Sequence, residues 1–373
     1  MSPSLSSLVR PAAAGLRAVG ADGVLRAIGD RGRLERGPRG RRWVPRPSRP
    51  FQILIYHRVR PGPSPFAIDA IPPERFARQM EHLARHFRVL PLEELRRRAE
   101  ERSVPPRAIA VTFDDGYADN HEFALPILAR LGLPATVFVV TGCVGTGVAP
   151  WHDRVLRAFE RTPLREALLP WSDELVAFPT EPDRRAAAFR TLAFLKPMAE
   201  EERLAAVSRL DDTLEIPEEA RGFGGLMLDW DQVRGLHRRG VAIGSHTVTH
   251  PILSRVAPDR IRSELVDSKR AIEEAVGEPA TLFAYPNGRP EDYTAEVVAA
   301  LDCAGYRVAV TTSFGTNEPG DDPLRWRRGT PWEPDLPRFA LKLAYYRLAG
   351  ETGAPRPGPA SPSATAPTGG AAR

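Results

Sequence analysis

From about residue 51 to residue 311, short apolar runs alternate with segments in which apolar positions recur at helical spacing. The segment Pro73–His86 shows the second pattern, because Phe76, Met80 and Leu83 fall on one helical face. Alternating strands and amphipathic helices are typical of βα units, which assemble into a parallel sheet or a barrel. The predicted strands are Phe51–Tyr56, Phe87–Leu92, Ala108–Phe113, Ala135–Val140, Val241–Ser245, Thr281–Ala284 and Arg307–Thr311. The predicted helices are Pro73–His86, Leu92–Arg102, Ala118–Leu131 with a bend near Pro126, Asp229–Gly240 with a capping box at Asp229 and Gln232, Pro258–Val276 closed by Gly277, and Thr294–Ala304.

Residues 145–225 interrupt this rhythm and are predicted to form a helical insertion over one face, with helices at Trp151–Glu160 and Arg184–Leu195. Residues 1–50 are expected to be a basic leader and a Pro- and Arg-rich linker. Residues 350–373 are low-complexity Pro, Ala, Gly and Thr, a composition that predicts a disordered tail. The main domain is therefore expected to span residues 51–345.

The net charge of +5 is unevenly placed along the 373 residues. Eleven arginines and three acidic residues give residues 1–50 a charge of +8, so the remaining residues carry −3. A basic leader on a slightly acidic body argues against a domain that binds nucleic acid. Apolar residues between positions 8 and 28 recur at roughly helical spacing, which suggests an interfacial helix on an anionic membrane, a short helix packed on the domain, or a disordered arm.

Three features of the sequence bear on the cellular compartment. Cys143 and Cys303 can form at most one bridge, no apolar run is long enough to span a membrane, and the amino terminus is a poor signal peptide. We expect a cytoplasmic protein, or one at the inner face of the membrane with peripheral contact through the basic leader.

Polar side chains that can bind metals follow several predicted strands. His57 follows "QILIY", Asp114 and Asp115 follow "IAVTF", and His246 follows "VAIGS", with His250 four residues on. Tyr285 and Pro286 follow a fourth strand, "TLFA". Because the carboxyl ends of parallel strands meet on one face of such folds, we expect these residues to converge there.

Two acidic residues after a strand can simply cap a helix or shape a turn. Adjacent side chains that leave a strand also diverge, so one carboxylate can bind a cation while the other faces a water molecule. A nearby divalent ion would offset the repulsion between Asp114 and Asp115. Gly116 permits the sharp exit of the backbone.

His246 and His250 could each be core or surface histidines, but two at this spacing after a strand look more like metal ligands. Thr247 occupies the position where a zincin metalloprotease needs Glu, which excludes that class. Two histidines and one carboxylate form the three-ligand set of a hydrolytic metal site.

The motifs "TFDDG", "SHTVTH" and "FAYPNG", in this order, resemble the polysaccharide deacetylase family of NodB-homology carbohydrate esterases over roughly residues 51–328. The resemblance implies a distorted (β/α) barrel with a helical insertion, and a divalent metal, zinc or else cobalt or nickel, held by Asp115, His246 and His250. Asp114 would be the general base. The motif "YHRV" is similar to that of a branch including bacterial exopolysaccharide N-deacetylases, which implies that His57 is the general acid; a buried structural His57 is the alternative.

Departures from the family pattern concern the third motif, which lacks its usual arginine. Arg328 is the residue expected to orient the base, with Arg325 and Arg327 as rivals. The resemblance assigns Tyr285 and Pro286 to oxyanion and substrate contacts, with the Tyr285 backbone N–H as the oxyanion donor. Packing of the Tyr285 ring against the barrel is the competing interpretation.

The expected activity is removal of N-acetyl groups from amino sugars of a polysaccharide or a glycan precursor, by attack of activated water. The same chemistry could act on a non-sugar amide or an O-acetyl ester. A glycan-binding relic without turnover is a further alternative, although mere binding has no need of both Asp residues. A glycosidase is disfavoured because its two carboxyl groups must flank a bond from opposite sides.

Overall fold

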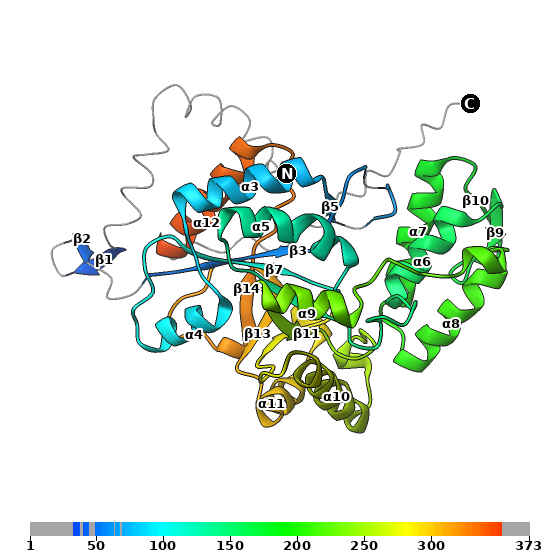
Figure 1. The fold of residues 1–373 in the computed structure, drawn as a ribbon. Coiled ribbons are helices and arrows are strands. Elements are labelled where there is room, and N and C mark those ends of the chain that lie inside the picture. The colour runs from blue at the N-terminus through cyan, green and yellow to red at the C-terminus, as the bar shows by residue number, and fades with distance from the viewer. Residues whose placement is uncertain (1–32, 38–39, 45–48, 63, 68, 353–373) are drawn as a thin grey trace.

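In the computed structural model, which describes residues 33–37, 40–44, 49–62, 64–67 and 69–352, a parallel sheet curls into a barrel (Figure 1). Its strands are rich in β-branched and other apolar residues, most of which are buried, as in parallel strands covered on both faces. The order around the barrel is β14–β13–β12–β11–β8–β7–β3, with β6 beside β7. The bounds are β3 Gln52–Tyr56, β6 Arg88–Val89, β7 Ala108–Phe113, β8 Thr136–Val139, β11 Ala242–Ser245, β12 Leu282–Ala284, β13 Val308–Phe314 and β14 Trp326–Arg328.

Backbone hydrogen bonds between the first and last strands nearly close this barrel. Gly329, directly after β14, donates to the carbonyl of Ile53 at 2.7 Å and accepts from the amide of Ile55 at 3.0 Å. The seven strands therefore form a nearly closed parallel barrel surrounded by helices, and the predicted fold class is confirmed.

Amphipathic helices surround the barrel, and α3 buries Phe76, Met80 and Leu83 as expected. Asp229 and Gln232 form the expected capping box, and Gly277 ends a helix with φ of 75°. Near Pro126 the structure has a π-helical turn, η1, before α5, instead of a simple bend. The bounds are α3 Pro73–His86, α4 Leu92–Glu100, η1 Asn120–Ala124, α5 Leu125–Leu131, α9 Trp230–Arg238, α10 Pro258–Val276, α11 Ala295–Cys303 and α12 Leu336–Thr352.

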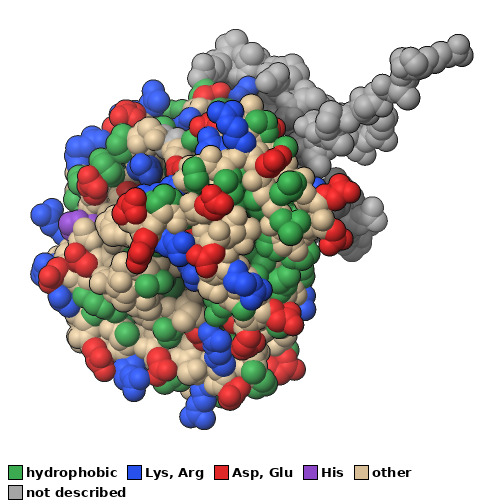
Figure 2. Space-filling model, turned by 90° about the vertical axis from the view of Figure 1, so that its right-hand side faces the viewer, with side chains coloured by type: hydrophobic (Ala, Val, Ile, Leu, Met, Phe, Trp, Pro, Cys, Tyr) green, Lys and Arg blue, Asp and Glu red, His purple; other side chains and the backbone are tan. Residues whose placement is uncertain are grey.

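The insertion between β8 and α9 gathers on one side of the barrel (Figure 1). It has an apolar cluster of its own, which includes Phe159, Phe178 and Leu210. Its outer face carries interspersed acidic and basic side chains with scattered apolar ones (Figure 2). Two of its helices were expected, whereas α8 and the small hairpin of β9 and β10 were not. The bounds are α6 Trp151–Arg161, β9 Glu166–Leu168, β10 Leu175–Ala177, α7 Glu181–Leu195 and α8 Glu200–Thr213.

The two ends of the chain differ in part from the expected linker and tail. An antiparallel hairpin of β1 Arg33–Gly37 and β2 Gly40–Val44 occupies part of the expected linker. Helix α12 runs to Thr352, past the predicted start of the tail at residue 350. The interfacial helix suggested for residues 8–28, and the rest of the tail, lie outside the described residues. Among the described residues, no helix combines the length and apolar character that crossing a membrane requires.

Candidate active site

The ends of β7 and β11 bring Asp115, His246 and His250 together in the buried interior of the barrel mouth. The Oδ1 atom of Asp115 lies 3.5 Å from Nε2 of His246 and 3.3 Å from Nε2 of His250. One potential ligand atom from each residue lies within 4.8 Å of the other two. All three side chains are buried.

Unusual backbone conformations aim these side chains. Asp115 and His250 have φ of 70° and 61°, a region that non-glycine residues rarely adopt and that often marks functional sites. Gly116, with φ of 78°, follows Asp115, and a Cβ there would lie 3.1 to 3.3 Å from atoms of Val139. A side chain at position 116 would therefore be strained and crowded, which explains the glycine of "TFDDG".

Hydrogen bonding and charge prepare both imidazoles to bind a cation. Nδ1 of His246 lies 2.7 Å from the carbonyl of Ala284, to which it donates, so Nε2 is the ring nitrogen that faces Asp115. Burial and the neighbouring His246 hold the pKa of His250 well below its usual value, so its ring is neutral. Burial opposes ionisation of Asp115, but the adjacent histidines outweigh it and the pKa of this carboxyl lies well below its usual value. Two imidazoles and one carboxylate fit a divalent ion such as zinc.

A buried carboxylate that we did not single out from the sequence holds the loop between the two histidines. Glu264 of α10 accepts hydrogen bonds from the amides of Val248 and Thr249 at 2.8 and 2.9 Å, and from the Thr249 hydroxyl at 2.6 Å. The loop is therefore fixed from a helix that packs beside β11. A Glu in the middle of an amphipathic helix carries no local sequence signal for such a role.

Asp114 points to a different partner from its neighbour. It forms a bidentate ion pair with Arg328 of β14, at 2.7 Å from Nη1 to Oδ1 and 2.6 Å from Nη2 to Oδ2. Burial opposes ionisation, but Arg328 outweighs it and the pKa of Asp114 lies below its usual value. The two rival arginines pair elsewhere, Arg325 with Asp322 at 3.5 Å and Arg327 with Asp321 at 3.2 Å.

His57 leaves β3 beside a second carboxylate. Its Nδ1 lies 3.7 Å from Oδ2 of Asp69, and its backbone carbonyl accepts a hydrogen bond from Asn120 at 2.8 Å. Asp69 has φ of 54° and was not singled out from the sequence. The carboxylate thus borders the Nδ1 side of the imidazole, although this buried nitrogen forms no hydrogen bond within the described residues.

The structure contradicts the oxyanion role expected for the Tyr285 amide. This N–H donates to the carbonyl of Val310 at 3.1 Å, because the residue still belongs to the hydrogen-bond ladder between β12 and β13. The Tyr285 hydroxyl donates to the carbonyl of Leu324 and its ring stacks on Tyr293, so the side chain packs the barrel. Pro286 has no N–H to offer. At Asn287 the buried Nδ2 has no hydrogen-bond partner within the described part of the chain.

The insertion contributes a further histidine that sequence analysis did not identify. Nε2 of His152, in the first turn of α6, lies 3.7 Å from Oδ2 of Asp115 and 3.5 Å from Oδ2 of Asp153. Burial opposes protonation, but Asp153 and Asp115 outweigh it and raise the pKa of His152 to about 9. A His-Asp pair at the start of a helix is an indistinct signal in a sequence.

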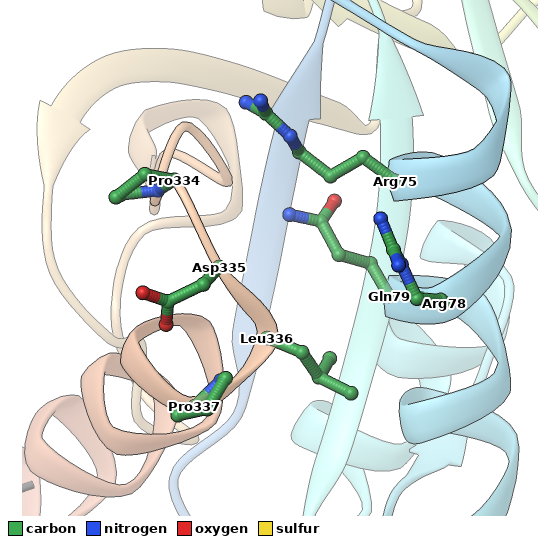
Figure 3. A pocket seen from close by; sticks show the side chains of 7 residues that line it. All are labelled: Arg75, Arg78, Gln79, Pro334, Asp335, Leu336 and Pro337. Atoms are coloured by element: carbon green, nitrogen blue, oxygen red, sulfur yellow. The ribbon is translucent and has the colours of Figure 1, made fainter.

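A cavity of about 250 Å³ lies apart from these residues, between α3 and the segment that leads into α12 (Figure 3). Arg75, Arg78 and Gln79 line one side, and residues 334–337 line the other. None of the site residues expected from the sequence lines this cavity.

Comparisons with known proteins identify the family of the chain. The model of the polysaccharide deacetylase family matches residues 101–309, and the chain belongs to that family of enzymes. A Bacillus subtilis (strain 168) protein named "Putative polysaccharide deacetylase YxkH" is 23% identical over 265 residues, which cover 70% of this chain and 64% of that protein. The match thus spans somewhat less than two thirds of that relative.

Solved structures share the fold. The Streptococcus pyogenes deacetylase PplD in complex with acetate has a TM-score of 0.55 at 19% identity, covering 79% of this chain and 98% of that one. IcaB from Ammonifex degensii has a TM-score of 0.53 at 20% identity, covering 81% and 98%. The polysaccharide deacetylase BC0361 from Bacillus cereus has a TM-score of 0.52 at 18% identity, covering 82% and 71%.

Replacing Arg328 by Ala should lower the free energy of unfolding by about 3 to 5 kcal/mol, because it leaves the buried Asp114 carboxylate without its partner. Urea denaturation measures this loss. Arg325→Ala is the matched control: its ion pair is half exposed, and its loss should cost about 1 kcal/mol or less. Equal losses of unfolding free energy in the two variants would contradict the claim that Arg328 compensates a buried carboxylate.

Proposed function

We propose that the protein is a metal-dependent hydrolase that removes N-acetyl groups from amino sugars of a polysaccharide or a glycan precursor. The observation that carries this proposal is that two adjacent carboxylates face different partners. Asp115 faces two histidines, whereas Asp114 pairs with an arginine. A site that only bound a cation would have no need of the second, separately oriented carboxylate.

Asp115, His246 and His250 would hold the divalent ion, with zinc as the best fit for two imidazoles and a carboxylate and with cobalt or nickel as substitutes. The bound ion would act as a Lewis acid on the acetyl carbonyl and would acidify water. Family membership supports this assignment, and the buried, closely spaced ligand atoms are consistent with it.

Asp114 is proposed as the general base that takes a proton from the attacking water. Arg328 keeps the Asp114 carboxylate ionised, so that this carboxylate can accept a proton. The two hydrogen bonds of the ion pair fix the orientation of the carboxylate. The cost is a weaker base, because the same charge that orients Asp114 lowers its proton affinity. Arg328 is accordingly proposed as a positioning residue.

His57 is proposed as the general acid that protonates the amine as the bond between nitrogen and the acetyl carbon breaks. The Asp69 carboxylate, 3.7 Å from its Nδ1, would help to orient the ring. The products would be acetate and a free amino sugar. No covalent link between enzyme and substrate is required in this sequence of steps.

The first test is release of acetate from N-acetylated glucosamine oligomers, with metal-stripped protein before and after addition of zinc, cobalt or nickel. We expect little release without metal and recovery on addition, because three protein ligands leave coordination positions for reactants. O-acetylated sugars and simple acetamides run in parallel test the ester and amide alternatives. Binding of oligomers without acetate release under every metal would favour the glycan-binding relic.

Two substitutions should separate the roles of the adjacent carboxylates. Asp114→Asn should lower kcat by about 100-fold or more with metal content unchanged, because it removes only the base. Asp115→Ala should lose the metal itself, since it removes one of three ligands. Metal content by atomic emission and kcat on the same samples give both readouts. An Asp114→Asn protein that turns over at the full rate would contradict the assignment.

The general-acid assignment is tested by His57→Gln, which should lower kcat by about 100-fold or more without loss of metal. A substrate with a better leaving amine should recover part of this rate, because it needs less help from an acid. His237→Gln, at a partly exposed histidine on α9, is the matched control. Equal effects of the His57 substitution on good and poor leaving groups would contradict acid catalysis.

A further inference from the structure

His152 reaches the site from the insertion, not from the barrel strands that carry the residues discussed above. It lies in the first turn of α6, next to Asp153, and its side chain is 13% exposed. Its ring centroid lies 4.9 Å from that of His250, nearly the same spacing as the 4.8 Å between the rings of His246 and His250. A third imidazole group therefore borders the proposed metal site from the side of the insertion.

The two oxygens of Asp115 face different partners. Oδ1 faces Nε2 of His246 and His250, whereas Oδ2 faces Nε2 of His152 at 3.7 Å. A carboxylate that binds an ion through one oxygen is usually held by a hydrogen bond to the other oxygen. For a direct hydrogen bond, Nε2 of His152 would have to move less than about 1 Å closer to Oδ2 of Asp115.

Buried side chains tie this histidine to the barrel. The Tyr117 hydroxyl donates to Oδ2 of Asp153 at 2.8 Å and lies 3.4 Å from Nε2 of His152. The guanidinium of Arg58 lies 4.6 Å from the centre of the Tyr117 ring and pairs with Asp119 at 2.8 Å. Three of these residues, Arg58, Tyr117 and Asp119, flank the proposed catalytic residues in the sequence, so the network connects both barrel motifs to α6.

We propose that His152 is a positioning residue for the metal site, whose single Nε2–H holds the second oxygen of Asp115. Oδ2 of Asp153 and the Tyr117 hydroxyl lie 3.5 and 3.4 Å from the same nitrogen and confine it to the side of Asp115. This inference rests on the proposed metal site. His152 acts through Asp115 and does not bind the ion: within the described residues, the group of side chains close enough together to share an ion consists of Asp115, His246 and His250. The insertion thereby becomes part of the metal site.

The test is the affinity for zinc of metal-stripped protein, measured by competition with a chromophoric chelator. His152→Ala should weaken zinc binding by about 10- to 100-fold, as loss of an outer-shell partner typically does. His152→Gln should recover part of this loss, because its amide N–H can still donate to Asp115. Tyr117→Phe should weaken binding less than His152→Ala does, and should add nothing when His152 is already Ala, because both act through the same contact.

Reference variants separate this inference from the proposed function. His237→Ala should bind zinc normally, and Asp115→Ala should lose it. If Asp115→Ala loses zinc while His152→Ala binds normally, the positioning role is overturned and the metal site stands. If Asp115→Ala also binds zinc normally, both the proposed metal site and this inference are overturned. A His152→Gln protein that binds zinc as weakly as His152→Ala, with thermal stability equal to wild type, would overturn the hydrogen-bonding role.

Discussion

The buried ion pair between Asp114 and Arg328 connects the site to the closure of the barrel. Arg328 ends β14, and the next residue, Gly329, forms the backbone hydrogen bonds that join this strand to β3. The same guanidinium donates to the Thr112 hydroxyl at 3.1 Å and to the Thr311 carbonyl at 2.8 Å. One short strand thus closes the barrel and orients the proposed base, so the geometry of the base depends on a correctly docked last strand.

Two adjacent buried carboxylates would repel each other in a featureless interior, and one of them would take up a proton. The barrel avoids this by turning the backbone at Asp115 and Gly116, so that the two side chains meet different partners. Arg328 compensates Asp114, and histidines from two separate segments surround Asp115. Each carboxylate therefore remains ionised because of different neighbours, and the proposed chemistry depends on this difference.

Much of the fold was readable from the sequence, because long periodic segments such as Pro73–His86 and Pro258–Val276 combine helical spacing with clear ends. The convergence of the two aspartates with His246 and His250 was readable too, because the carboxyl ends of parallel strands meet on one face. The choice of Asp115 over Asp114 as the ligand came from the family resemblance. Strand β14 was missed since three residues are too few to show a period. Roles that depend on tertiary contact left no local signal in the sequence. Glu264 lies in the middle of a helix, and His152 lies in an insertion. The Tyr285 amide still bonds to β13 although it lies one residue beyond the end of β12.

The most direct measurement is anomalous diffraction at the zinc absorption edge from crystals of the zinc-loaded protein. The account predicts one strong peak about 2.0 to 2.2 Å from an oxygen of Asp115 and from Nε2 of both His246 and His250, with Asp114 still paired to Arg328. A peak bound by Asp114, or stoichiometric zinc located elsewhere with these three residues empty, would contradict it.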